Sequence, residues 1–124
     1  DQSGSHAKLW IEISEALDSF FADLKEHNAS DNVVVMLFSE FGRRVRDNGT
    51  GTDHGAAGVA FVIGDRVNGG MYGQYPSLRP EDLSQGDLVP NYDFRGLYSS
   101  LVDSWMGLDP VPVVGGKFEQ MSFV

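Results

Sequence analysis

The feature that most constrains the fold of this 124-residue chain is an unbroken apolar run at 33–38, with the sequence VVVMLF. The run does not alternate between apolar and polar residues, as a strand with one wet face does. Short continuous apolar runs are typical of strands covered on both faces, as in parallel sheets packed between helices. We therefore predict an α/β fold with a buried strand near 32–38.

An amphipathic helix is expected before this strand. Apolar residues recur at spacings of three and four from Leu9 to Leu24, which is the stripe of a helix with one buried face. Ser5 as an N-cap and Asn28 as a stop place this helix near 6–27. Helix, short loop and buried strand together form half of a crossover unit.

A second amphipathic helix is expected near 93–106, with Asp93 as its N-cap and Gly107 at its end. Between the strand and this helix we expect a Gly-rich loop at 42–55, a short β-prone run at 59–63 and an irregular excursion at 76–90. Two strands are too few for an independent sheet. Residues 1–124, which begin at Asp1 without a signal, are therefore expected to be the C-terminal portion of one α/β domain whose strand partners lie upstream.

Charge and composition exclude several classes of partner. Eighteen acidic and nine basic side chains give a net charge of −9, which repels phosphate backbones and anionic lipids, so we expect no nucleic-acid binding. No apolar run approaches the roughly 20 residues of a membrane-spanning helix, so no membrane insertion is expected. The chain has no cysteine, so any metal must be held by oxygen and imidazole ligands.

The first candidate site residues lie in SEFGRR at 39–44, directly after the predicted strand. Ligands of open α/β sheets bind outside the carboxyl ends of the strands, so the Glu40 carboxylate is better placed for function than a carboxylate on a helix face. The structural alternative is an ion pair, between Glu40 and a nearby arginine or between Arg43 and a carboxylate.

The second candidate pair is Asp53-His54, within GTDHG at 51–55. A carboxylate and an imidazole between flexible glycines suit a metal site, although a lone histidine in a glycine loop is more often a turn residue. The segment 47–53 fails as an EF-hand because glycines stand at ligand positions and no glutamate follows. It also fails as a phosphate loop because it lacks the GK[ST] ending.

Several ordered motifs resemble an uncharacterised bacterial family, the domain of unknown function 1501 group. They are SEFGRR at 39–44, GTDHGAA at 51–57, MYGQYPSL at 71–78, GDL at 86–88, DFRGLYSSLVDSWMG at 93–107 and VVGGKFEQMSFV at the end. The resemblance covers nearly the whole chain. That family in turn resembles the alkaline phosphatase and sulfatase superfamily, which implies a mixed or parallel sheet packed between helices.

In the superfamily, two metal ions, usually zinc, manganese or calcium, flank a Thr or Ser nucleophile. A strand-end carboxylate and a later histidine are among the ligands, and by order along the chain Glu40 and His54 resemble them. The resemblance makes Asp53 either a third ligand or a carboxylate that orients His54, and it makes Arg43 a candidate clamp for an anionic substrate group. Phe41 departs from the pattern, because it stands where a histidine ligand is expected and a phenyl ring cannot coordinate a divalent cation.

The resemblance implies an exported, periplasmic, metal-dependent phosphatase-like or sulfatase-like hydrolase, whose substrate would be an anionic small-molecule ester. The nucleophile and an Asp-x-His ligand pair would lie upstream, so no catalytic residue is expected in this segment. The upstream part of the same protein is the expected partner, and the segment alone should neither hydrolyse esters nor bind a metal tightly. The rival prediction, favoured by Phe41, is a non-catalytic exported binding or assembly protein that keeps the fold.

Overall fold

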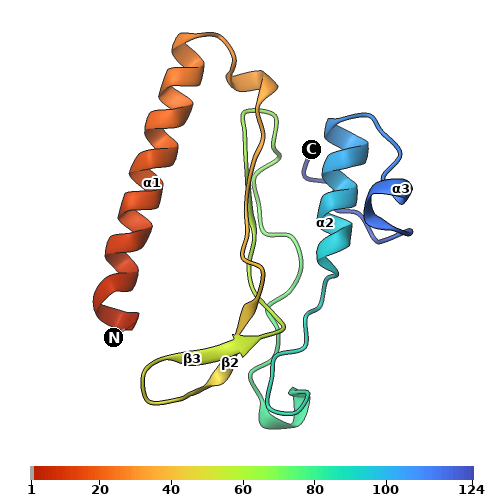
Figure 1. The fold of residues 1–124 in the computed structure, drawn as a ribbon. Coiled ribbons are helices and arrows are strands. Elements are labelled where there is room, and N and C mark those ends of the chain that lie inside the picture. Colours follow the sequence, from red (N-terminus) through yellow and green to blue (C-terminus); the bar gives the residue numbers. More distant parts are fainter. Residues whose placement is uncertain (1) are drawn as a thin grey trace.

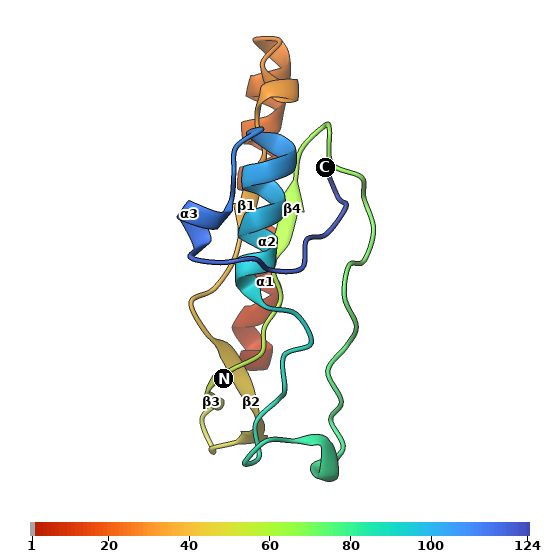
Figure 2. The ribbon, with the colours of Figure 1, turned by 90° about the vertical axis from the view of Figure 1, so that its right-hand side faces the viewer.

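The chain forms three thin layers in the computed structural model, which describes residues 2–124 with side chains from residue 4 onward. A long helix lies on one side of a two-stranded sheet, and a second helix lies on the other side (Figure 1). The view at right angles shows the same order of helix, sheet and helix (Figure 2). The elements of these layers are α1 (Gln2–Glu26), β1 (Val35–Leu37), β4 (Phe61–Ile63), α2 (Phe94–Ser100) and the π-helical turn η3 (Leu101–Trp105). The α/β prediction is therefore confirmed in general terms.

The first helix forms as the apolar stripe predicts, but it starts earlier, at Gln2, so Ser5 lies inside α1 and is not its N-cap. The helix ends at Glu26, Asn28 follows with a left-handed φ of 53°, and the Ala29 N–H donates to the Leu24 carbonyl (2.9 Å). This is a Schellman-type stop, which Asn tolerates better than most residues. Asn28 is therefore confirmed as the stop.

The central strand differs from the prediction in its pairing and in its burial. β1 pairs with β4 in antiparallel register, with Met36 opposite Val62, and both sheets among the described residues are two-stranded and antiparallel. Residues 33–37 are only half-buried, and Phe38 is 57% exposed. A strand buried on both faces is thus a wrong prediction for this chain, because a single strand pair leaves each strand one open edge and the helices cover only part of the apolar run.

The segment expected to be a loop, 42–55, is a β-hairpin made of β2 (Gly42–Asp47) and β3 (Thr52–Gly55). Its turn closes through Asn48 N–H donating to the Gly51 carbonyl (2.8 Å), and Gly49 takes a left-handed φ of 96°. Asn-Gly at such a turn is a strong hairpin signal, since Asn and Gly accept the backbone conformations that a tight turn requires. The β-prone run at 59–63 becomes β4 (Phe61–Ile63). The excursion at 76–90 is irregular apart from the turn η2 (Pro80–Asp82) and an antiparallel bridge between Ser84 and Asp87.

The second predicted helix is confirmed as α2 followed by η3. Asp93 caps it, because its Oδ1 accepts the Arg95 backbone N–H (2.9 Å), and Gly107 ends it with a φ of 66°. The C-terminal tail then returns across the helix after the short turn α3 (Val111–Val114). The Ser100 hydroxyl, which is fully buried, donates to the Gly96 carbonyl and accepts the Met121 N–H, both at 2.8 Å.

The hydrophobic core is very small for a chain of this size. Among the described side chains only Ala57, Val102 and Phe123 are buried apolar residues, and the accessible surface is 8947 Å². A compact monomer of 13.6 kDa exposes about 6,600 Å², so this chain exposes roughly a third more. Among residues 2–124, no helix combines the length and the apolar character needed to cross a membrane.

Candidate functional site

The candidate site lies on the β2–β3 hairpin, which sits at the carboxyl end of β1 (Figure 1). Gly42, at the start of β2, lets the hairpin lie close to the segment that follows β3. A Cβ on Gly42 would stand 1.6 Å from the Ala57 carbonyl oxygen, and the Arg43 N–H donates to that same oxygen (3.3 Å). Only a residue without a side chain allows this approach. Gly42 therefore fixes where the SEFGRR and GTDHGAA segments meet.

The Phe41, Arg43 and His54 side chains gather on the hairpin, and we call this group the hairpin stack. The Phe41 and His54 rings are stacked, with centroids 3.5 Å apart and planes 14° from parallel. The Arg43 guanidinium carbon lies over the Phe41 ring, 5.1 Å from its centroid. Arg43 and His54 are also direct cross-strand partners in the hairpin register, and such partners share one face of a sheet.

Arg43 makes no ion pair among the described residues, whose four ion pairs all lie elsewhere. Its Nη1 donates to the Thr52 carbonyl (2.8 Å), so one edge of the guanidinium is used and the other N–H donors remain. The structural alternative for this residue, a pair with Glu40 or Asp53, is not what the structure shows. The side chain is exposed and keeps the donors that an anion requires.

Neither predicted carboxylate ligand forms an ion pair with His54 among the described residues. Asp53 Oδ1 accepts the Asn48 side-chain amide (2.7 Å), and consecutive residues of a strand point to opposite faces. Asp53 therefore lies on the other face of the hairpin from the stack, where it braces the turn. Glu40 is exposed and takes part in none of the ion pairs of the described residues.

The residues present do not build a metal site on their own. Within the described part of the chain, no three His, Asp or Glu side chains are placed to hold one ion. A closed site needs about four ligands, and a catalytic one needs three together with an open position. Glu40, Asp53 and His54 thus remain predicted ligands.

Asp87 is a residue of this region to which the sequence analysis gave no role. Its half-buried carboxylate accepts the Ala56 N–H at Oδ2 (3.0 Å) and the Leu88 N–H at Oδ1 (2.8 Å), and a Cβ on Gly55 would stand 2.7 Å from Oδ1. Asp87 thereby ties the GDL segment to the end of β3, two residues beyond His54. The only sequence signal was the GDL motif itself, which does not reveal a contact made 31 residues away.

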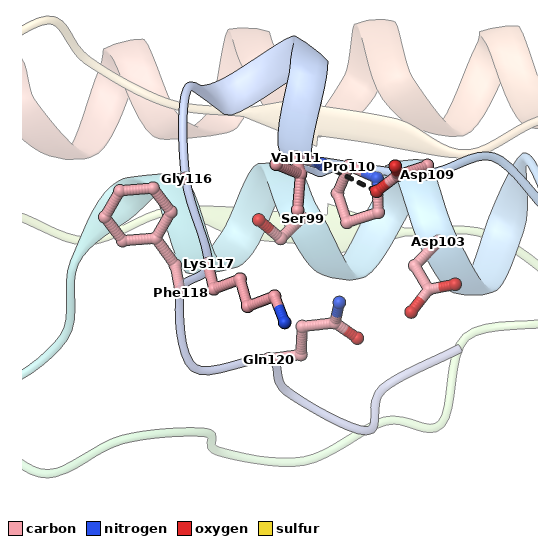
Figure 3. A pocket seen from close by; sticks show the side chains of 9 residues that line it. All are labelled: Ser99, Asp103, Asp109, Pro110, Val111, Gly116, Lys117, Phe118 and Gln120. Atoms are coloured by element: carbon pink, nitrogen blue, oxygen red, sulfur yellow. Dashed lines mark hydrogen bonds between the residues drawn. The ribbon is translucent and has the colours of Figure 1, made fainter.

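A second feature, a pocket of about 250 Å³, lies between the end of α2, the turn α3 and the returning tail. Its lining residues are Ser99, Asp103, Asp109, Pro110, Val111, Gly116, Lys117, Phe118 and Gln120 (Figure 3). Asp109 is engaged in its own turn, since its Oδ1 accepts the Val111 N–H (3.0 Å). The pocket is smaller than the ~300–1,000 Å³ of typical small-molecule sites, and none of the predicted site residues lines it.

The fold and the hairpin define an α/β chain with a surface group of one aromatic and two nitrogen-bearing side chains at a strand end. The chain belongs to the family described as "Protein of unknown function (DUF1501)", whose model matches residues 1–113. The resemblance inferred from the motifs is thereby confirmed at the level of the family. No curated protein matches the chain, and no solved structure matches it.

Proposed function

We propose that this chain is the C-terminal part of an exported, metal-dependent hydrolase of the phosphatase or sulfatase type, and that the hairpin is its contribution to an anionic-ester site. The observation that supports this most is the cross-strand placement of Arg43 beside His54 at the carboxyl end of β1. Positively charged and imidazole N–H donors at such a strand end suit a phosphate or sulfate group.

The proposal assigns the remaining machinery to an upstream part of the same protein. That part would supply the nucleophile, the missing ligands for a zinc, manganese or calcium ion, and the strands that cover the open edges of β1 and β4. The large accessible surface supports this division, because 8947 Å² is roughly a third more than a compact monomer of this mass exposes. When bound, the metal would neutralise charge that develops on the ester oxygens.

Metal analysis and calorimetry test this proposal on the 124-residue chain and on a longer protein that includes the upstream part. We expect weak metal binding by the chain alone, stoichiometric metal in the longer protein, and a lower content in its His54→Ala variant. His27→Ala is the matched control, because His27 is an exposed histidine that bonds only within its own helix end. Equal metal content in His54→Ala and wild type would remove His54 from the site, and tight stoichiometric metal in the chain alone would overturn the incomplete site.

A non-catalytic exported binding or assembly protein is the second candidate function, and one observation favours it. Phe41 stacks on His54 at the position where the superfamily has a histidine ligand, so this side chain replaces a ligand by a packing contact. Only the first of these two functions predicts that the protein hydrolyses an ester. A longer protein that holds metal at His54 but releases no phosphate or sulfate from aryl esters would support the binding protein.

A further inference from the structure

The hairpin stack contains a side chain whose role the proposed hydrolase does not explain. Phe41 is half-buried, yet it contacts two polar residues: the His54 ring at 3.5 Å and the Arg43 guanidinium at 5.1 Å, both measured between group centres. A phenyl ring in a chain with so small a core would be expected to bury itself among apolar side chains. Here it supports two side chains that remain exposed.

Stacking leaves the nitrogen atoms of the imidazole accessible. In a parallel stack the Phe41 face covers one face of the His54 ring, whereas the two nitrogens lie at the ring edge and donate or accept in the ring plane. The rotation of His54 is thereby restricted without loss of its hydrogen-bonding groups. The same ring attracts the Arg43 guanidinium through its quadrupole, which restricts that side chain as well.

Arg43 and His54 are consequently neighbours on one face of the hairpin. Because both side chains are already restricted, they lose little conformational entropy when a ligand binds. Arg43 is always charged, and its Nη1 contact with Thr52 orients the fork while leaving further N–H donors. The surrounding chain is acidic, with a net charge of −9, but no carboxylate forms an ion pair with this arginine in the described residues. An unpaired guanidinium beside an imidazole is the donor set that recognises a tetrahedral oxyanion.

We infer that Phe41 is a positioning residue that holds Arg43 and His54 as one oxyanion-binding pair, able to bind phosphate or sulfate without a metal ion. The inference deepens the proposed function in its class of ligand. It does not depend on the metal, because the donors belong to the hairpin alone. Phe41, which stands where the resemblance expects a histidine ligand, thus supports an anion site.

The test is a phosphate titration of the chelator-treated 124-residue chain at pH 7 and constant ionic strength, followed by NMR of the His54 ring. In the wild type we expect the His54 ring protons to be shifted upfield by the Phe41 ring, and to move further as phosphate binds. Phe41→Leu should abolish the upfield shift, and Phe41→Tyr should retain it because the stacking face is kept. Circular dichroism checks that each variant is folded.

Phosphate affinity should fall on the order of tenfold in Arg43→Gln, since a charge-assisted contact is lost, and also fall in Phe41→Leu. The matched control is Arg46→Gln, an exposed arginine on the same strand that lies outside the stack. The inference is overturned if phosphate leaves the His54 signals unchanged, or if Arg46→Gln weakens binding as much as Arg43→Gln. Because the metal is absent throughout, neither result depends on whether the longer protein is a hydrolase.

Discussion

At the scale of the residue, glycine decides how closely the two motif segments around the hairpin approach. We predict that Gly42→Ala destabilises the chain by about 1–3 kcal/mol, the usual cost of forced overpacking, because its Cβ would overlap the Ala57 carbonyl. Gly69→Ala is the control, since nothing lies within 4 Å of a Cβ built there. Thermal or urea unfolding measures both, and equal stability of the two variants would contradict the close approach.

The Asp93 carboxyl provides a second test at this scale. Hydrogen bonds from the Arg95 side chain, and next from the Arg95 backbone N–H, lower the pKa of Asp93 from 3.8 to about 2. A lowered folded-state pKa means that this interaction stabilises the fold above pH about 4, and that the contribution is lost as the pH falls from about 4 through about 2. In Arg95→Gln we expect the pKa of Asp93 to rise towards 3.8, measured by ¹³C NMR titration of the carboxyl group. An unchanged pKa would show that the side-chain pair is not formed in solution.

At the scale of the element, the sequence predicts best what local periodicity determines. Both helices were found from their apolar stripes, and Asn28, Asp93 and Gly107 mark helix ends because their local preferences suffice. The hairpin does not follow from the pattern of residues 42–55, because its glycines favour a loop, although Asn48-Gly49 is the dipeptide that favours a tight turn. The direction of the β1 pairing was predicted wrongly, since it depends on which distant segment supplies the partner strand.

The candidate site, like the fold, could be predicted from the sequence only in part. The sequence selected Arg43 and His54 from their residue types, but it did not place them side by side, because their contact depends on the hairpin register. From the sequence, Phe41 is recognised only as a residue that cannot be a metal ligand. The stacking contact, like the role of Asp87, follows from a meeting of distant segments that no spacing in the sequence reveals.

The contact between α2 and the returning tail yields a prediction for an element pair. Ser100→Ala removes the hydroxyl that accepts the part-buried Met121 N–H, and the loss of a buried donor's partner costs up to about 1–3 kcal/mol. We expect faster amide exchange at Met121 and lower thermal stability. Ser104→Ala, at an exposed position of the following turn η3, is the control and should change neither. Slow exchange at Met121 in Ser100→Ala would mean that the tail is held by other contacts.

At the scale of the whole molecule, the structure has layers around a very small core. The helices and the sheet occupy the order expected of an α/β domain (Figure 2), yet α1 leaves Leu9, Ile13 and Phe20 of its apolar stripe exposed at 53%, 38% and 43%. Apolar side chains exposed along one stripe of a helix are typical of a surface that packs against another element. The proposed upstream part of the same protein would cover both this face of α1 and the open edges of the sheet.

This proposal predicts that one substitution has different effects in two contexts. In the 124-residue chain, Leu9→Gln should change the free energy of unfolding by no more than about 0.5 kcal/mol, as is usual for an exposed site. In a longer protein with the upstream part, the same change should cost about 1.5–3 kcal/mol, because a buried leucine is then replaced by a polar group. Glu12→Gln, three residues further along the same helix and in an exposed pair with Lys8 (3.7 Å), should remain within about 0.5 kcal/mol in both. Urea unfolding of the four variants measures the difference, and an equally small effect of Leu9→Gln in both contexts would show that the upstream part leaves this face of α1 uncovered.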